Sequence, residues 1–215
     1  MDAKFLVRQA GLHRGMIAGI LQCDMRYSPE HKAEVHEKIV KDAARRVRAE
    51  GMTGAGVATV MKDAGLTHGG FYKHFGSKDE LLAESLRQAF EEIAARLTEA
   101  ARHAKPGTAW KAMVKEYLSV EHCEQVDRGC PLAALAPELA RADTELKPKI
   151  ARELLRYRDR MVPYMPGRQT AEKVRNFLVI ISTMLGAVSL ARILPEREMR
   201  ERVLGTVREF LLGSF

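Results

Sequence analysis

The stretch VATVMKDAGLTHGGFYKHFGSKDELL, residues 57–82, decides the fold of this chain. Its first part is typical of a short helix that ends at Gly65, and a second short helix is expected over about 68–74. Phe71 and Phe75 share one face of that second helix and can pack against the helix before the stretch. The sequence therefore predicts a helix-turn-helix held in a three-helix core.

The opposite face of the second short helix is small, hydroxyl-bearing or cationic. Its two glycines each cost about 1 kcal/mol of helix stability relative to alanine, which makes sense if the backbone approaches a DNA groove closely. Hydroxyl and cationic groups suit phosphate contacts, and the first residues of the helix could reach base edges. The alternative is an ordinary solvated glycine corner. The expected DNA-contacting residues are Thr67, His68, Gly69, Gly70, Tyr72, Lys73, His74 and Lys78.

Positive charge is concentrated around this stretch. The chain carries a net charge of +7, and residues 26–78 hold ten Lys/Arg against six Asp/Glu. Such a segment is consistent with a phosphate-facing surface, although a solvated basic face without a partner has the same composition.

The rest of the chain predicts further helices and no strand of useful length. Hydrophobic residues make up 46% of the 215 residues and aromatic residues only 6%, a mixture that favours helix. The fold class expected is all-α, with a three-helix head followed by a larger helical domain. The boundaries expected are an extension at 1–27, the head at 28–78 and the larger domain at 79–215, whose helices span about 78–103, 108–123, 131–141, 144–164, 169–194 and 196–212.

The head resembles the N-terminal DNA-binding domain of the TetR/AcrR (tetracycline-repressor) family. The resemblance rests on AEG at 49–51, on MKDAGLTHGGFYKHFGSKDELL at 61–82 and on the long helix that follows, and it covers roughly residues 31–85. It implies that Thr67, His68, Gly69 and Gly70 face bases, and that Tyr72, His74 and Lys78 contact the DNA backbone.

Two positions depart from that family pattern. Ala55 and Gly56 stand where Thr or Ser is common, so Thr53 either replaces one phosphate contact or that contact is absent. Met61 stands where a small alanine is usual, which predicts different local packing.

The resemblance also implies a helical domain for ligand binding and dimerisation. In the apolar helix expected at 169–194, small residues would let a partner helix approach closely, and the final helix adds a second apolar stripe. A dimer would place two reading helices one DNA turn apart, and double-stranded DNA with a palindromic operator is the expected partner. The alternative is that both helices are core helices of a monomer. The interface residues expected are Gly186, Ala187, Ala191, Val203, Val207 and Phe210.

An unidentified small-molecule effector is the second expected partner. Methionine and aromatic side chains form adaptable apolar walls, although such a stripe is also what a plain core looks like. The candidate pocket residues are Trp110, Met113, Tyr117, His122, Met161, Tyr164, Met165, Phe177 and Met184.

Cys123 and Cys130 allow a further hypothesis. Arg128, His122 and a helix start at Pro131 could lower the pKa of these thiols and make them redox sensors, while inert buried cysteines are the alternative. Metal binding by the histidine and the two cysteines lacks a ligand spacing that supports it. We expect no metal, no cofactor and no membrane span, and the odd cysteine count suits the cytoplasm.

The expected mechanism is repression relieved by a small molecule, with activation as an alternative. Two other classes of protein are alternatives: a small helical enzyme, and a helical interaction protein whose DNA-binding face is vestigial. No phosphate loop, metal motif or nucleophile–base pair supports an enzyme. Residues 1–24 match nothing in the family, and Met25-Arg26-Tyr27 resembles a natural beginning, so a mis-assigned start or a flexible arm is our hypothesis for them.

Overall fold

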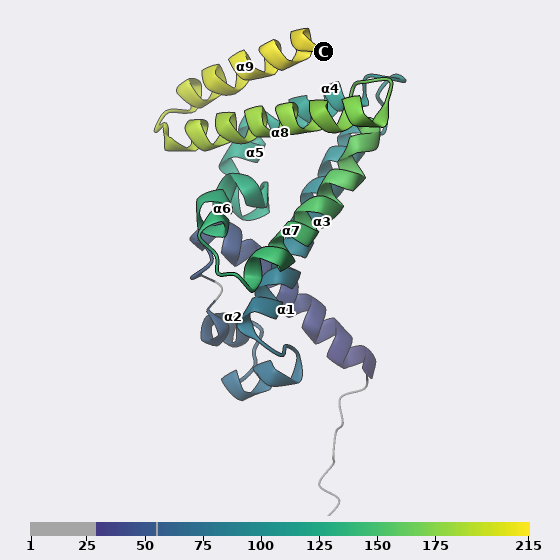
Figure 1. The fold of residues 1–215 in the computed structure, drawn as a ribbon. Coiled ribbons are helices and arrows are strands. Elements are labelled where there is room, and N and C mark those ends of the chain that lie inside the picture. Colours follow the sequence, from purple (N-terminus) through teal and green to yellow (C-terminus); the bar gives the residue numbers. More distant parts are fainter. Residues whose placement is uncertain (1–28, 55) are drawn as a thin grey trace, which may run out of the picture. The chain divides into compact units, whose positions relative to one another are not determined.

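A computed structural model of the protein describes residues 29–54 and 56–215, and the regular structure within these ranges is entirely helical (Figure 1). The expectations for residues 1–27 lie outside these ranges. The first elements are α1 (Pro29–Glu50), α2 (Val57–Asp63), the 3₁₀ helix η1 (His68–Lys73) and α3 (Lys78–Ala101). They are followed by α4 (Ala109–Tyr117), α5 (Val120–Glu124), η2 (Val126–Arg128), α6 (Pro131–Ala140), α7 (Leu146–Met161), η3 (Val162–Tyr164), α8 (Thr170–Ile193) and α9 (Arg197–Ser214).

The end of α2 forms the tight turn that the sequence predicts. Gly65 has φ 76°, a backbone conformation that favours glycine. The Gly65 N–H donates to the Lys62 carbonyl at 3.0 Å, and the Leu66 N–H donates to the Met61 carbonyl at 2.8 Å. This pair of bonds is a Schellman motif, which satisfies carbonyls that the end of a helix leaves open.

The start of α3 is fixed by a capping box. Ser77 Oγ accepts a hydrogen bond from the Glu80 N–H at 3.1 Å. The Glu80 carboxylate in turn accepts from the Gly76 N–H at 2.7 Å, one residue before the cap. Hydrogen bonds from backbone N–H groups therefore fix the chain on both sides of η1, at Gly65 and Leu66 before it and at Gly76 and Glu80 after it.

Two of the expected helices are broken in the structure. The helix expected at 108–123 is interrupted near Leu118, because Ser119 caps a new helix by accepting from the His122 N–H at 3.1 Å. The helix expected at 144–164 ends at Met161 and continues as η3, since Pro163 has no N–H to donate.

The side chains form two apolar clusters. The first is the core of the head and contains Ile39, Val47, Phe71 and Phe75. It continues into α6 and α7 through four further buried residues. Those four residues are Leu135, Leu139, Leu146 and Ile150. The second, larger cluster joins α3, α4, α7, α8 and α9. Packing therefore has no break at residue 78, and the boundary expected there stays a prediction.

Helix α8 is long and apolar enough to cross a membrane by length and composition alone, with a mean hydropathy of 1.7. It nevertheless packs against α9, with which it runs side by side, and against α6 and η3 (Figure 1). Its residues Phe177, Ile180, Val188 and Ala191 belong to the large apolar cluster. These contacts are those of a core helix.

Candidate nucleic-acid interface and buried chamber

The helix-turn-helix is held by an aromatic core. Phe71 and Phe75 are buried and stack on each other with ring centroids 5.4 Å apart. The His36 ring of α1 stacks on Phe75 at 4.6 Å and its Nε2 lies 2.8 Å from a carboxylate oxygen of Glu84 on α3. The segment after the turn is a 3₁₀ helix and not the α-helix expected, so it is short and tightly wound.

The outer face of η1 is open to solvent. Tyr72 is 71% exposed although it is aromatic. The other predicted contact residues divide into an exposed group and a half-buried pair. The exposed group is Thr67, His68, Gly69, Lys73 and Lys78, and the half-buried pair is Gly70 and His74. The structure thus brings all eight predicted residues to one segment, six of them at the surface.

The two glycines of η1 have different surroundings. A Cβ added at Gly69 would meet no heavy atom within 4 Å, and the residue does not have a positive φ. Nothing within the protein therefore requires glycine at this position. A Cβ at Gly70 would lie 3.5 Å from the terminal methyl group of Met61, which is buried. The methionine that departs from the family pattern thus packs next to a glycine.

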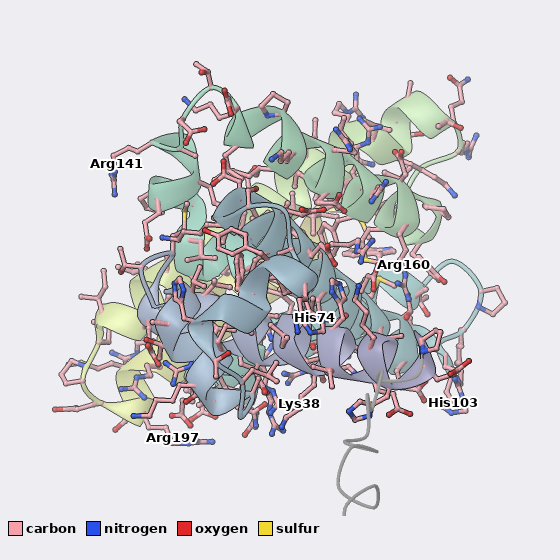
Figure 2. All side chains as sticks on the ribbon, turned by 90° about the horizontal axis from the view of Figure 1, so that it is seen from below. Lys38, His74, His103, Arg141, Arg160 and Arg197 are labelled. Carbon is pink, nitrogen blue, oxygen red and sulfur yellow. The ribbon has the colours of Figure 1, made fainter. Side chains whose placement is uncertain are left out.

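The basic residues near the head do not all face outward. Arg48 is buried and its Nη2 donates to Glu92 at 2.6 Å, so it does not contribute to a phosphate-facing surface. Arg46 forms ion pairs with Glu50 and Asp63. Five lysines of the head have no ion pair with another described residue, whereas Lys41 pairs with Glu37. They are Lys32, Lys38, Lys62, Lys73 and Lys78; Figure 2 shows Lys38 on the face viewed from below.

Arg48 also joins α1 to the loop before α6. Its Nη1 donates to the Gly129 carbonyl at 3.5 Å, a long bond. A second link lies close by, where the Met52 N–H donates to the carboxylate of Glu138 on α6 at 2.8 Å. Polar contacts therefore connect the helices of the head to the α5–α6 region at two points.

A closed apolar chamber lies among α3, α4, α7 and α8. Its volume is about 20 Å³, room for about one water molecule. Six of the predicted pocket residues line it: Trp110, Met113, Met161, Met165, Phe177 and Met184. The remaining walls, which the sequence analysis missed, are Leu97, Val114, Tyr157, Ile180 and Ile181. No local motif marks these five, because they are ordinary apolar positions on four helices.

Three predicted pocket residues, Tyr117, His122 and Tyr164, do not line the chamber. Tyr117 is fully buried in the apolar cluster. Tyr164 is half-exposed, at 38%. His122 is fully buried, donates from Nδ1 to the Tyr117 carbonyl and accepts the Cys130 N–H at Nε2 over 3.0 Å. Burial, helped by the cations Arg96 and Arg192 and opposed by the hydrogen bond to the Tyr117 carbonyl, lowers the pKa of His122 to about 4. His122 is therefore neutral at pH 7, and its ring fixes the loop before α6.

The two cysteines are buried, and burial raises the pKa of both thiols. The lowered pKa expected from neighbouring cations is wrong, because desolvation outweighs the attraction of Arg192. The structure gives no support to a reactive thiolate at Cys123 or Cys130. Both ring nitrogens of His122 are already in hydrogen bonds, and among the described residues no group of three or more His, Cys, Asp and Glu is arranged for a metal ion.

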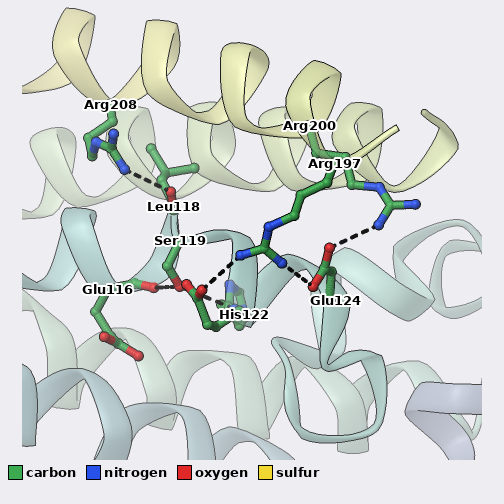
Figure 3. A network of polar contacts seen from close by, with 9 residues as sticks. Glu116, Leu118, Ser119, His122, Glu124, Arg197, Arg200 and Arg208 are labelled. Atoms are coloured by element: carbon green, nitrogen blue, oxygen red, sulfur yellow. Dashed lines mark hydrogen bonds and ion pairs between the residues drawn. The ribbon is translucent and has the colours of Figure 1, made fainter. Parts of the chain in front are cut away.

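A polar network ties α9 to α4 and α5 (Figure 3). Arg197 and Arg200 both donate to Glu124, at 2.8 and 3.1 Å, and Arg208 donates to the Leu118 carbonyl at 3.3 Å. Glu124 is the last residue of α5, the helix that carries His122, and Leu118 lies two residues before its start. The position of α9 is thus linked to the buried histidine.

The expected interface residues divide between surface and interior. Ala187 and Ala191 are buried inside this chain, so they were wrongly assigned to a surface that meets a partner. Val203 and Val207 pack partly against the same core, whereas Gly186 and Phe210 are exposed. Other large exposed apolar side chains on α8 and α9, which the sequence analysis did not name, are Leu178, Val179, Leu190, Ile193 and Met199.

Comparisons with known proteins agree with this arrangement. Residues 39–85 match the family described as bacterial regulatory proteins, tetR family. The HTH-type transcriptional regulator LmrA of Bacillus subtilis (strain 168) is 29% identical over 119 residues, a match that covers 54% of this chain and 61% of that protein. The uncharacterized HTH-type transcriptional regulator Rv0196 of Mycobacterium tuberculosis is 28% identical over 83% of this chain and 94% of its own.

The solved structures show the same fold. A TetR transcriptional regulator from Chloroflexus aurantiacus superposes with a TM-score of 0.68 at 24% identity, over 85% of this chain and 96% of that one. The fold and the head are those of a helix-turn-helix transcriptional regulator and not of an enzyme. The head is thus similar to that of the tetR family of bacterial regulatory proteins, and the fold of the chain is that of solved regulators of this family.

Proposed function

We propose that this regulator is a dimeric repressor that leaves its palindromic operator when a small molecule binds. The observation that carries the DNA-binding part is η1, an exposed helix whose Gly69 serves no purpose inside the protein. A backbone without a side chain at this point can approach the floor of the major groove closely. Lys73 and Lys78 on either side of the following turn supply phosphate contacts.

The dimer is supported by the outer faces of α8 and α9. Ile193 and Phe210 are 78% and 66% exposed. Large apolar side chains that are exposed together on a surface mark an interaction site. The two helices run side by side, so a second copy related by a two-fold axis could cover both (Figure 1). A Phe210→Glu variant should shift the protein from dimer to monomer in light scattering.

The effector would bind in the apolar chamber. Four methionines line the chamber, and their flexible side chains can repack around a ligand. A ligand that prefers an enlarged chamber would favour a state with different spacing between the heads, which lowers operator affinity. Such a protein acts on chromosomal DNA, and the cytoplasm is the compartment that we propose for it.

A gel shift with the DNA upstream of the gene tests the proposal. The wild-type protein should bind it in a sequence-selective manner and with a steep dependence on salt. Lys78→Gln should weaken binding to all sequences and lower the salt slope by about 1, whereas His68→Ala should also change the sequence preference. Lys105→Gln, an exposed lysine in the α3–α4 loop, is the matched control and should change nothing.

Two results would contradict the proposal. Binding that is indifferent to sequence would favour an interaction protein over a regulator of specific genes. An unchanged affinity in both Lys78→Gln and His68→Ala would show that η1 is not the reading element.

A further inference from the structure

A second cavity, of about 140 Å³, lies between α3 and α7. Three arginines line it, Arg87 from α3 and Arg156 and Arg160 from α7, together with the carboxylates of Glu91 and Glu153. The Glu153 carboxylate, which is only 8% exposed as a residue, already accepts from Arg156 at 3.0 and 3.1 Å. The lining thus holds three guanidinium groups and two carboxylates, one of which is already paired with Arg156.

The other two arginines are weakly engaged. Arg87 Nη2 lies 3.7 Å from Glu84 Oε2, which is longer than an ordinary hydrogen bond. Arg160 has no ion pair with another residue of the described ranges. Both are exposed, and Figure 2 shows Arg160 among the side chains seen from below. Two guanidinium groups on facing helices are therefore open to an anion.

This cationic cavity adjoins the apolar chamber. Tyr157 lines both of them. On α3 the lining continues from Arg87 through Phe90 and Ala94 in the cavity to Leu97 in the chamber, one face of a helix. The Tyr157 ring lies between the two, 5.3 Å from the Phe90 ring on one side and 6.2 Å from the Phe177 ring on the other.

The two spaces have opposite chemistry. The chamber offers aliphatic, methionine and aromatic walls, where an unpaired charge would be costly. The cationic cavity offers guanidinium groups, which bind carboxylate and phosphate oxygens well. A ligand that occupies both must be apolar at one end and anionic at the other.

We infer that the effector is an amphiphile with a flexible apolar chain and an anionic carboxylate or phosphate head. Its chain would enter the chamber past Tyr157, and its head would bind Arg87 and Arg160. The small volume of the chamber means that the methionines must repack to admit the chain, so binding changes the packing of α3 against α7. Because α3 starts in the head, this change could reach the DNA-binding surface. The inference deepens the proposed function by naming the chemical class of its ligand.

Trp110 allows a direct test with unlabelled ligands. It is the single tryptophan of the chain, is buried, and lines the chamber, so its fluorescence reports on entry of a chain. The probes are decanoate, decyl phosphate, decan-1-ol and decylamine, each below its micellar concentration, and acetate as a head without a chain. We expect both anions to bind at least about tenfold more tightly than the alcohol, the amine to bind most weakly, and acetate to leave the emission unchanged.

The variant Arg87→Gln/Arg160→Gln separates the head from the chain. It should reduce the affinity for decanoate and decyl phosphate to that for decan-1-ol and leave decan-1-ol binding unchanged. Arg152→Gln removes another exposed arginine of α7 that does not line either space, and it should behave as the wild type. Circular dichroism of each variant checks that the fold is kept. The carboxylate and phosphate arms show which head the site prefers.

The inference is overturned if the alcohol binds as tightly as the anions, if none of the decyl probes binds, or if the double variant keeps its preference for anions. These measurements contain no DNA, so they are independent of the gel shift. Selective anion binding without operator binding would remove the repressor and leave the amphiphile site. The reverse result would remove the amphiphile site alone.

Discussion

The head and the chamber are built from the chain in opposite ways. The proposed DNA-contacting residues lie within twelve consecutive positions, Thr67 to Lys78, and they are largely exposed. The chamber draws its walls from four helices that are separated by as many as eighty residues, and all of its walls are buried. A surface that reads DNA can be encoded locally, whereas an enclosed space exists only once distant helices have packed.

A buried charge links the head to the helices that follow it. Glu92 of α3 and the Gly129 carbonyl before α6 accept N–H groups of Arg48 on α1. A buried ion pair contributes little net stability, but removal of one partner leaves the other charge uncompensated. The largest effect in the molecule is therefore expected here.

Glu92→Gln should lower the free energy of unfolding by about 3 kcal/mol, because the buried Arg48 guanidinium loses its counter-charge. Arg48→Met/Glu92→Met removes both charges and should be less destabilised than the single variant. Urea denaturation measures both. Arg46→Gln, which breaks more exposed ion pairs with Glu50 and Asp63, is the control and should cost much less than Glu92→Gln. Equal losses in Glu92→Gln and Arg46→Gln would show that Arg48 is not a special link.

The buried His122 gives the helical domain a pH-dependent stability. Its pKa is about 4 in the folded protein and 6.5 ordinarily, mainly because burial disfavours the charged ring. Between these two values the unfolded chain takes up a proton that the folded protein does not. The free energy of unfolding is therefore unaffected by protonation of His122 above pH 6.5 and decreases as the pH falls from 6.5 toward 4.

We expect His122 to contribute about 2–3 kcal/mol to the loss of stability between neutral pH and pH 4. His122→Gln, whose amide can still donate and accept, should flatten this part of the profile. Urea denaturation at a series of pH values measures the slope. His103→Gln, in the exposed α3–α4 loop, serves as the control and should leave the slope unchanged. A wild-type slope in His122→Gln would assign the pH dependence to other groups.

The sequence predicted the head better than the chamber for a physical reason. Gly65, Ser77 and the two phenylalanines act through bonds and contacts close in sequence, so a pattern of residue types is enough to place them. Six chamber residues were also found, since methionine and aromatic side chains stand out among aliphatic ones. Tyr157 was missed because its role depends on Phe90 and Phe177, which are far from it in sequence.

Errors in the sequence analysis arose where packing decides between surface and interior. Ala187 and Ala191 look like small residues that a partner helix could approach, but α9 and the core of the same chain cover that side of α8. Arg48 counts toward the positive charge of residues 26–78, and only the position of Glu92 shows that its side chain points inward. The residue type alone does not determine whether a side chain points to the surface or into the interior.

Gly69→Ala tests the head with the smallest expected effect on stability. The added Cβ meets no atom of the protein and alanine has the higher helix propensity, so the free energy of unfolding should rise by up to about 1 kcal/mol. Operator affinity should fall in the same variant, because the methyl group would stand between the η1 backbone and the groove floor. Thermal denaturation and the gel shift measure the two effects.

Gly186→Ala is the matched control, since this exposed glycine of α8 also has open space at its Cβ position and lies outside the head. It should stabilise the protein similarly, and in the gel shift its affinity should stay that of the wild type as long as the dimer forms. If Gly69→Ala gains stability and keeps its operator affinity, the glycine is a neutral feature of the head. In that case only the side chains of η1 would contact the DNA groove. The contrast between a locally encoded DNA-binding surface and a chamber assembled from distant helices would lose its most direct support.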